Sequence, residues 1–330
     1  MNKSVGLVAV LTAARVVAPL EGVADPLPSW NEGAAKRSLM LFVARVTDSN
    51  SSGYVAPAER IAVFDNDGTL WPEQPIYTQA LFGMDRAKAA AASHPDWQAR
   101  EPFKSALAGD LKGLEATGVR GLIELTTGAT SGMTVEEFDR AVADWLGTAR
   151  HPRFQRPYTE CVYQPMLEVL SYLRASGFKT YIVSGGSLEF LRPWTQAAYG
   201  IPPEQVIGST AVTRYELRDG KPVLVRAPEI EHLTDREEKA VAIQRVIGQR
   251  PIACFGNSDG DLGMLSWTAA GSGPRFCLYV HHTDAAREWA YDRTASVGRL
   301  NQGLDIARAQ GWTVVDMKND WKKVFPFEKP

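Results

Sequence analysis

The chain has 330 residues, of which 45% are hydrophobic and 22% are charged, as in ordinary globular proteins. This length allows one large domain with an insertion, or two modest domains. The 36 basic and 38 acidic residues nearly balance, so the charge gives no indication of binding to nucleic acid or to a membrane surface and favours small-molecule partners. The three cysteines exclude a fold held by a disulfide framework. No feature of the sequence indicates an oligomeric state.

The N-terminal residues 1–24 have the features of a possible secretory signal peptide. Lys3 precedes an apolar run, and Gly22-Val23-Ala24 is an acceptable small-residue cleavage site. This pattern predicts a periplasmic or secreted protein. Arg15 interrupts the apolar run, so a cytoplasmic N-terminus is the alternative. No stretch of the chain reaches the ~20 apolar residues of a transmembrane helix, so we expect no membrane span.

Short apolar runs that end in polar or glycine-rich loops alternate with stretches of helical periodicity. The predicted strands are Ile61–Phe64, Thr180–Val183, Ile252–Phe255, Phe276–Val280 and Trp312–Val315. The predicted helices are Ala34–Val46, Pro165–Ser176, Leu188–Ala198 and Thr234–Ile247. This alternation predicts an α/β fold with a doubly wound, mostly parallel sheet, in which ligands gather at the carboxyl ends of the strands.

The long stretch between the first two predicted strands is rich in Ala, Leu and charged residues and has few β-branched runs. It is far longer than a crossover connection requires, which predicts an inserted subdomain of several helices. We therefore expect a core domain of residues 25–70 and 160–330, and a helical cap insertion of residues 71–159.

The segment Asp65-Asn66-Asp67-Gly68-Thr69 follows the first predicted strand directly. A carboxylate on the residue that ends a strand is held rigidly, which suits Asp65 to in-line nucleophilic attack on phosphorus. Asp67, two residues later, suits a general acid that protonates the leaving oxygen and then deprotonates water. A calcium-binding loop is the alternative, but the segment lacks the pattern and the closing Glu of an EF-hand. The segment resembles the DxDGT nucleophile motif of the haloacid dehalogenase superfamily.

Three further segments resemble elements of this superfamily, in the same order along the chain. Ser184-Gly185-Gly186 closes a strand and resembles the second motif, which implies that Ser184 and Gly185 bind the phosphate. Lys239 lies where the superfamily places the lysine that pairs with the nucleophile and the phosphate. Residues 256–265 resemble the acidic loop GDxxxDxxML of phosphoserine phosphatase-like members. The resemblance spans about Ile61 to Leu265 and implies a Rossmann-like core with a cap.

The resemblance also implies a bound Mg²⁺, because a phosphate dianion repels an attacking carboxylate and needs positive charge beside it. The implied oxygen ligands are Asp65, the main-chain carbonyl of Asp67, and the loop of residues 256–261. Asn257 stands where relatives have an aspartate, so it offers an oxygen without a charge. We expect Asp259 to restore that charge by ligating the metal, with Asp261 in its family role, and Asn257→Asp to tighten magnesium binding.

Substrate-facing residues are harder to predict from the sequence. Glu73 follows the nucleophile loop, where serine phosphatase-like members often use an acid to meet the substrate amine. Arg86, Arg100 and Lys104 are cations of the insertion that we expect to face the substrate, with ordinary surface charges as the alternative. Trp71 and Tyr77 either line the pocket or pack the cap. The pair His281-His282 has no metal-ligand spacing and is predicted to be an ordinary loop pair.

These observations predict a Mg²⁺-dependent phosphomonoester hydrolase that acts through an aspartyl-phosphate on a small organic phosphate. The resemblance is strongest to the phosphoserine phosphatase-like group, with the insertion as a lid over the site. Haloacid dehalogenase chemistry is disfavoured by Asp67, because no alkoxide leaving group needs a proton there. A phosphomutase, or a non-catalytic protein that binds phosphorylated ligands, remains the alternative. The substrate itself is not encoded in any recognisable motif.

Overall fold

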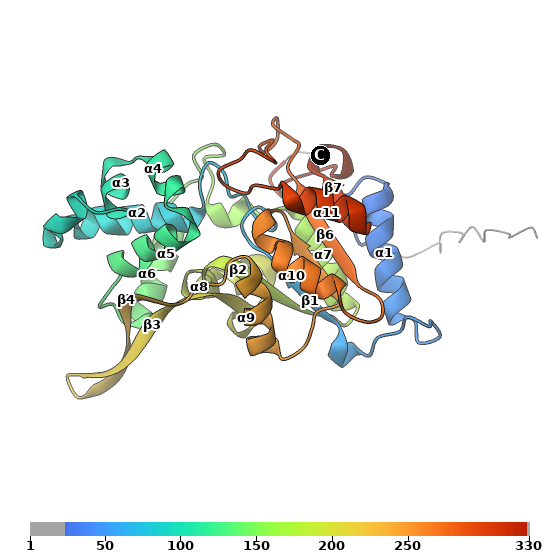
Figure 1. The fold of residues 1–330 in the computed structure, drawn as a ribbon, viewed down its shortest axis with the longest axis horizontal. Helices are drawn as coiled ribbons and strands as arrows, with labels where there is room; N and C mark the ends of the chain where they lie inside the picture. Colours follow the sequence, from blue (N-terminus) through green and yellow to red (C-terminus); the bar gives the residue numbers. More distant parts are fainter. Residues whose placement is uncertain (1–23, 329–330) are drawn as a thin grey trace, which may run out of the picture.

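The computed structural model describes residues 24–328 and contains one seven-stranded sheet, in the order β4-β3-β2-β1-β5-β6-β7 (Figure 1). The strands are β1 Ile61–Phe64, β2 Lys179–Ser187, β3 Val206–Arg218, β4 Lys221–His232, β5 Ala253–Gly256, β6 Phe276–His281 and β7 Thr313–Asp316. Neighbouring strands pair in parallel, except that β3 and β4 form an antiparallel hairpin. The predicted α/β fold with a mostly parallel sheet is therefore confirmed.

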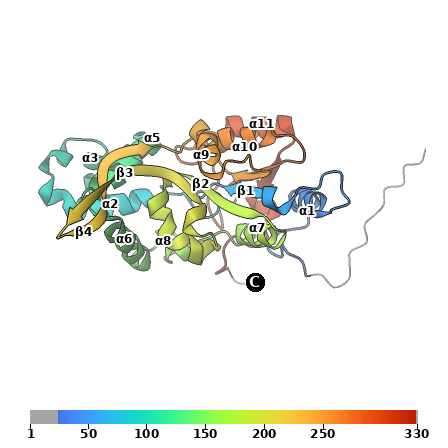
Figure 2. The same ribbon diagram turned by 90° about the horizontal axis from the view of Figure 1, so that it is seen from below.

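Helices cover both faces of this sheet (Figure 2). One face packs against α1 Ala34–Thr47, α7 Gln164–Ala175 and α8 Leu188–Tyr199, and the other against α9 Glu237–Ile247, α10 Leu262–Ala269 and α11 Gln302–Gln310. Strand β1 is buried on both sides: Ala62 and Phe64 belong to the first core, Ile61 and Val63 to the second. This alternation is the period of two expected of a strand at the centre of a sheet.

The insertion between β1 and β2 is helical, as predicted. Its helices are α2 Thr78–Ala90, α3 Phe103–Ala108, α4 Leu111–Ala116, α5 Gly118–Ala129 and α6 Val135–Thr148. They lie together at one side of the core in Figure 1, with their own apolar cluster around Trp97 and Phe103. The domain boundaries that we expect from the sequence, including the limits 71 and 159 of the cap, stay predictions.

The hairpin of β3 and β4 is a feature that the sequence analysis missed. Its turn is Asp219-Gly220, and both residues have positive φ, 50° and 75°. An Asp-Gly pair between alternating apolar and polar residues is the sequence signal that would have revealed it. Strand β4 also holds the cap: Gly132 N donates to Arg226 O and Arg226 N to Met133 O, both at 2.9 Å. The cap is thus tied to an extension of the central sheet.

The described residues begin after most of the possible signal peptide and end beyond a short C-terminal helix. The possible signal peptide, residues 1–24, lies outside the described residues except for Ala24. At the other end, a short helix α12, Met317–Asp320, follows β7. Within residues 24–328, no helix combines the length and the apolar character that crossing a membrane requires.

Candidate active site

Asp65 lies at the carboxyl edge of the central strand β1. Its backbone N–H donates to Phe255 O at 2.9 Å, which continues the pairing of β1 with β5 beyond the strand end. Beneath it, the rings of Phe64 and Phe255 stack with centroids 4.2 Å apart. The Asp65 side chain is buried. Packing on both sides therefore holds this carboxylate rigidly, as its position in the sequence predicts.

Lys239 binds the Asp65 carboxylate from the first turn of α9. Its ammonium donates to Asp65 Oδ1 and to Asp261 Oδ1, each at 2.6 Å. Burial alone would lower the pKa of Lys239, but the carboxylates of Asp261 and Asp65 outweigh it and raise that pKa. Burial and the charge of Asp261 raise the pKa of Asp65 well above its usual value, against the opposing effect of Lys239. Lys239 is therefore a permanent cation beside the predicted nucleophile.

Both carboxylate oxygens of Asp261 are already engaged. Oδ1 accepts from Lys239, and Oδ2 accepts from the backbone N–H groups of Asn257 and Ser258 at 2.9 and 3.0 Å. Asp261 thus positions the lysine and fixes the turn that begins the 257–261 loop. This arrangement gives it a positioning role, in place of the direct metal ligation expected from the sequence.

Asp67 follows Asp65 on the loop, and its orientation depends on a tryptophan. Trp71 Nε1 donates to Asp67 Oδ1 at 2.8 Å. Burial raises the pKa of Asp67, while the hydrogen bond from Trp71 opposes that rise. A carboxyl group whose pKa is raised keeps its proton at higher pH, which suits a general acid. Trp71, whose role the sequence left open, is therefore part of the site and also packs against the core.

The Ser184-Gly185-Gly186 turn lies at the end of β2, which runs four residues further than predicted. Gly186 N donates to Ser184 Oγ at 3.0 Å, and a hydrogen bond from the Ser184 side chain opposes the rise that burial causes in the pKa of Asp67. Ser187 then caps α8, accepting from Phe190 N at 3.2 Å. A helix N-terminus that follows a glycine-rich turn presents N–H groups and a positive dipole to an anion. The turn therefore has the geometry of a phosphate site.

Gln79, in the first turn of the cap helix α2, contacts this turn and was not predicted. Its Oε1 accepts from Ser187 N at 2.8 Å. Its Nε2 is buried and has no hydrogen-bond partner within residues 24–328. A buried amide N–H without a hydrogen-bond partner lowers the stability of the folded protein. A ligand oxygen that accepts a hydrogen bond from Gln79 Nε2 would therefore bind favourably at this position. No local sequence pattern marks this residue, because only the docking of the cap brings it to the turn.

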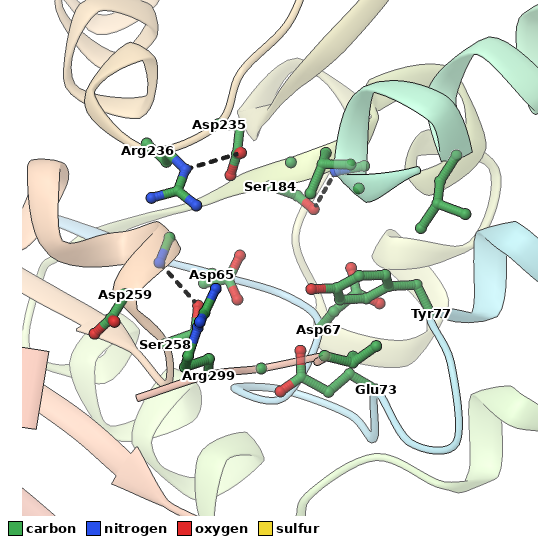
Figure 3. A pocket seen from close by; sticks show the side chains of 18 of the residues that line it. Asp65, Asp67, Glu73, Tyr77, Ser184, Asp235, Arg236, Ser258, Asp259 and Arg299 are labelled. Atoms are coloured by element: carbon green, nitrogen blue, oxygen red, sulfur yellow. Dashed lines mark hydrogen bonds and ion pairs between the residues drawn. The ribbon is translucent and has the colours of Figure 1, made fainter. Parts of the chain in front are cut away.

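These residues line one cavity of about 530 Å³ between the core and the cap (Figure 3). The residues that the core contributes include Asp65, Asp67, Ser184, Lys239, Asp235, Arg236 and Ser258. The cap contributes Tyr77 and an apolar wall of Val119, Leu122 and Ile123. The C-terminal segment of residues 296–302, beyond the motif resemblance, closes a third side. Tyr77 thus lines the pocket.

The three cations expected to face the substrate do not line this cavity. Arg86 borders a separate surface hollow beside Asp85 and Trp145. Arg100 lies over the ring of Phe103, 4.9 Å from its centroid, and Lys104 is exposed. Their contact with a substrate stays a prediction that this cavity does not support, because the face that a cap helix turns to the core depends on how the helices dock and not on residue type.

Glu73 does line the cavity, but its contacts differ from those expected. Its Oε1 accepts from Asn257 Nδ2 at 2.6 Å and from the Tyr291 hydroxyl at 2.8 Å. The Asn257 Oδ1 in turn accepts from Thr69 Oγ1 at 3.1 Å. Burial raises the pKa of Glu73 well above its usual value, the hydrogen bond from Tyr291 opposes this, and the charge of Asp65 adds to it. Asn257 and Glu73 are therefore a hydrogen-bonded amide and carboxyl pair.

Asp259 has a structural role. Its Oδ1 accepts from the backbone N–H groups of Asn301 and Gly303 at 3.0 and 2.8 Å, and its Oδ2 from that of Gln302 at 3.3 Å. A carboxylate in this place satisfies the free N–H groups at the start of α11 and favours its dipole. The expectation that Asp259 supplies the missing charge to a metal is thus not met, because both of its oxygens hold the helix.

A model of the haloacid dehalogenase-like hydrolase family matches residues 62–266, more than half of the chain. The chain belongs to this family. The match begins within β1 and ends in α10, so it contains Asp65, Asp67, Ser184, Lys239 and the 257–261 loop. Residues 267–328, which supply Tyr291 and the 296–302 wall of the cavity, lie outside it.

Solved structures show the same fold at low sequence identity. A protein of unknown function from Bordetella pertussis Tohama I is 18% identical with a TM-score of 0.50, over 78% of this chain and 99% of that one. A functionally unknown protein from Anaerococcus prevotii DSM 20548 is 13% identical with a TM-score of 0.55, over 91% and 98%. A comparison with curated proteins found no match.

The oxygen donors of this hydrolase-family site fit a magnesium ion. Burial raises the pKa values of Asp65, Asp67 and Glu73 together, so these crowded carboxyl groups would be stabilised by a further cation. Residues 24–328 contain no cluster of three His, Cys, Asp or Glu side chains arranged to hold a metal. Asp65 and the main-chain carbonyl of Asp67 are the donors that would hold Mg²⁺, which prefers oxygen and keeps several waters. Asn257 Oδ1 would join them only by giving up the hydrogen bond that it accepts from Thr69 Oγ1.

The pairing of Asn257 with Glu73 reverses our expectation for Asn257→Asp. A carboxylate in place of the amide would lie against Glu73 Oε1, where the amide nitrogen now donates at 2.6 Å. We expect the two acids to share one proton, so that magnesium affinity does not rise and thermal stability falls by about 1–3 kcal/mol for the lost buried hydrogen bond.

The test combines this change with Glu73→Gln, which moves the amide to the other side of the pair. Thermal unfolding and a magnesium-binding titration should show the double variant recovering the stability that Asn257→Asp loses. Tighter magnesium binding by Asn257→Asp alone, without loss of stability, would show instead that Glu73 already carries a proton in the native protein.

Proposed function

We propose that this chain is a Mg²⁺-dependent phosphomonoester hydrolase that works through an aspartyl-phosphate on Asp65. The observation that carries the proposal is the buried Asp65 carboxylate, bonded to Lys239 at 2.6 Å, in one cavity with Asp67 and the Ser184 turn. Phosphoryl transfer needs a nucleophile, a cation, a general acid and a site that binds the phosphate oxygens. In this cavity these parts are Asp65, Lys239, Asp67 and the Ser184 turn. Membership of a hydrolase family supports the same reaction class.

In the first step, an Asp65 oxygen attacks phosphorus and the bond from phosphorus to the ester oxygen breaks. Asp67 gives its proton to the departing alcohol oxygen. In the second step, Asp67 takes a proton from a water that attacks the aspartyl-phosphate, and inorganic phosphate and the Asp65 carboxylate are released. Lys239 and the donors of the 184–187 turn hold the phosphoryl oxygens. Bound Mg²⁺ supplies positive charge that neutralises the phosphate and the attacking carboxylate.

The rest of the cavity would hold the leaving group. Its size and its apolar cap wall suit a small organic phosphate, with Gln79 Nε2 as a donor to a substrate oxygen. The cap excludes water from the reacting atoms. Assignment to the phosphoserine phosphatase-like group rests on the motifs alone and stays a proposal, because the Glu73 oxygen that would meet an amine is bonded to Asn257 and Tyr291.

Other reactions on this fold are distinguishable. A phosphomutase would transfer phosphate between sugar positions without net release, and a dehalogenase would have no use for the Trp71-oriented Asp67. A non-catalytic phosphoryl-binding protein would leave every phosphomonoester intact. Export also remains a proposal, which N-terminal sequencing of the mature protein tests by showing whether residues 1–24 are removed.

A panel of phosphomonoesters, assayed for released phosphate, tests the proposed function. We expect hydrolysis of at least one small ester, with a rate that falls at least about tenfold on chelation and returns with added Mg²⁺. Arg86→Ala, which changes a cation outside the cavity, is the matched control and should behave as the wild type. Full activity in chelator, or no hydrolysis of any ester with saturating Mg²⁺, would overturn the proposal.

A further inference from the structure

Residues 282–291, which lie outside the family match, contact the chain that follows the nucleophile Asp65. His282, which follows β6, has its Nε2 2.8 Å from the carbonyl oxygen of Gly68. Its Nδ1 lies 3.0 Å from Glu288 Oε2. The His282 and Glu288 side chains are essentially fully buried, with 1% and 0% of their surfaces exposed. The interaction is therefore shielded from water, which strengthens it.

The partners of this histidine determine where its hydrogens lie. A carbonyl oxygen only accepts, so Nε2 must carry a hydrogen and donate to Gly68. Glu288 is surrounded by donors: the Tyr163 hydroxyl donates to Oε1 at 3.1 Å, and Trp289 N donates to Oε2 at 2.7 Å. These donors fix the Glu288 carboxyl group, which in turn holds the His282 ring at Nδ1. His282 is thus held on both sides, by the loop and by a fixed acid.

The same segment also reaches Glu73. The His282 ring stacks on that of Tyr291, with centroids 4.4 Å apart and planes at 19°. Tyr291 N donates to His282 O at 3.1 Å, and the Tyr291 hydroxyl donates to Glu73 Oε1. One short C-terminal stretch therefore holds two points of the chain that follows the nucleophile, Gly68 and Glu73.

Gly68 is a position where small displacements matter. Its φ is +79°, and a Cβ there would lie 2.1 Å from Asn257 Nδ2 and 2.5 Å from Glu73 Oε1. Its N–H donates to Trp71 O at 2.7 Å, which bends the loop so that Trp71 reaches Asp67. The N–H of Gly68 is part of the Asp67-Gly68 peptide and its carbonyl is part of the Gly68-Thr69 peptide, so hydrogen bonds hold the peptides on both sides of Gly68.

We propose that His282 is a positioning residue for catalysis, which fixes the Gly68-Thr69 peptide through the Gly68 carbonyl and so holds the loop that aims the Asp67 carboxyl at the leaving oxygen. The inference rests on the proposed function. It assigns a role to His282, one of two neighbouring histidines that the sequence predicts to be an ordinary loop pair, and to a segment outside the family match.

The test compares His282→Phe, which keeps an aromatic ring against Tyr291 but removes both hydrogen bonds, with His282→Gln, which keeps a donor for Gly68. We expect His282→Phe to lower kcat about 10- to 100-fold with little change in KM, and His282→Gln to restore most of it. In the rate of phosphoenzyme formation, the loss should be larger for alkyl phosphates than for aryl phosphates with good leaving groups, because only the alkyl leaving oxygen needs the proton of Asp67. His281→Phe, the same change at the neighbouring partly exposed histidine, should leave the rate unchanged.

Equal losses in the rate of phosphoenzyme formation from alkyl and aryl esters, or equal losses in His282→Phe and His282→Gln, would overturn the positioning role and leave a purely structural one. Glu288→Gln tests the same bond if His282→Phe does not fold, and should show the same bias toward alkyl esters. Backbone hydrogen exchange separates this inference from the proposed function. Even in a protein without phosphatase activity, His282→Phe should speed exchange at residues 66–71 and His282→Gln should not; unchanged exchange would contradict the inference.

Discussion

Asp65→Asn is expected to lower turnover on the order of 10⁴-fold or more, because it removes the nucleophile and no other group in the cavity replaces it. The fold should persist. Burial raises the pKa of Asp65 against the opposing effect of Lys239, so keeping the carboxylate ionised costs stability in the folded state compared with the unfolded state, and a neutral amide removes that cost at neutral pH. Lys239 keeps Asp261 as a partner. Thermal stability should therefore stay the same or rise.

Acid quenching of the enzyme during turnover of a labelled phosphomonoester measures this effect directly. The wild type should trap a phosphoenzyme, and Asp65→Asn should trap none. Asp219→Asn is the matched control, since it makes the same chemical change at the exposed tip of the hairpin, where asparagine also tolerates the positive φ of 50°. A phosphoenzyme that survives in Asp65→Asn would place the phosphoryl group on another residue.

Asp67→Asn is expected to lower kcat by about 10²–10⁴-fold with the nucleophile intact, because it removes proton transfer to and from the reacting oxygens. The amide can still accept the hydrogen bond from Trp71 Nε1, so the loop geometry should be retained. Formation of the phosphoenzyme should be impaired most for alkyl phosphates, whose leaving oxygen needs a proton. Its hydrolysis should be slow for every substrate, because no base activates the water.

Rapid-quench measurements with an alkyl and an activated aryl phosphate separate the two steps. Asp67→Asn should accumulate phosphoenzyme from the aryl ester at a rate near that of the wild type and then release phosphate slowly. If both steps keep their wild-type rates, Asp67 is not the acid and base, and the proposed mechanism fails although Asp65 remains the nucleophile.

The chemistry of this site was largely predictable because it depends on short segments that end strands. An apolar run followed at once by Asp65 predicts a rigid carboxylate at the edge of a sheet, and the later runs predict that the Ser184 turn and the 257–261 loop meet it there. The fold class followed from the same alternation. The 206–232 hairpin was not predicted although Asp219-Gly220 signals its turn, because residues 213–217 are exposed and the outer half of β3 lacks the buried apolar run that marks a strand.

The sequence alone thus determined which polar segments follow the strands of the sheet and in which order. Each of these segments is a local pattern, and the strand before it places it at the carboxyl edge of a parallel sheet. Only the tertiary structure decided which side chains of other segments meet them. Asp259 holds the start of α11, Glu73 pairs with Asn257, and His282 contacts Gly68. These contacts join residues far apart in the chain, and their partners depend on how helices and loops dock. A side chain's charge or polarity does not specify such docking, which is why Arg86 faces away from the cavity and Gln79 faces into it.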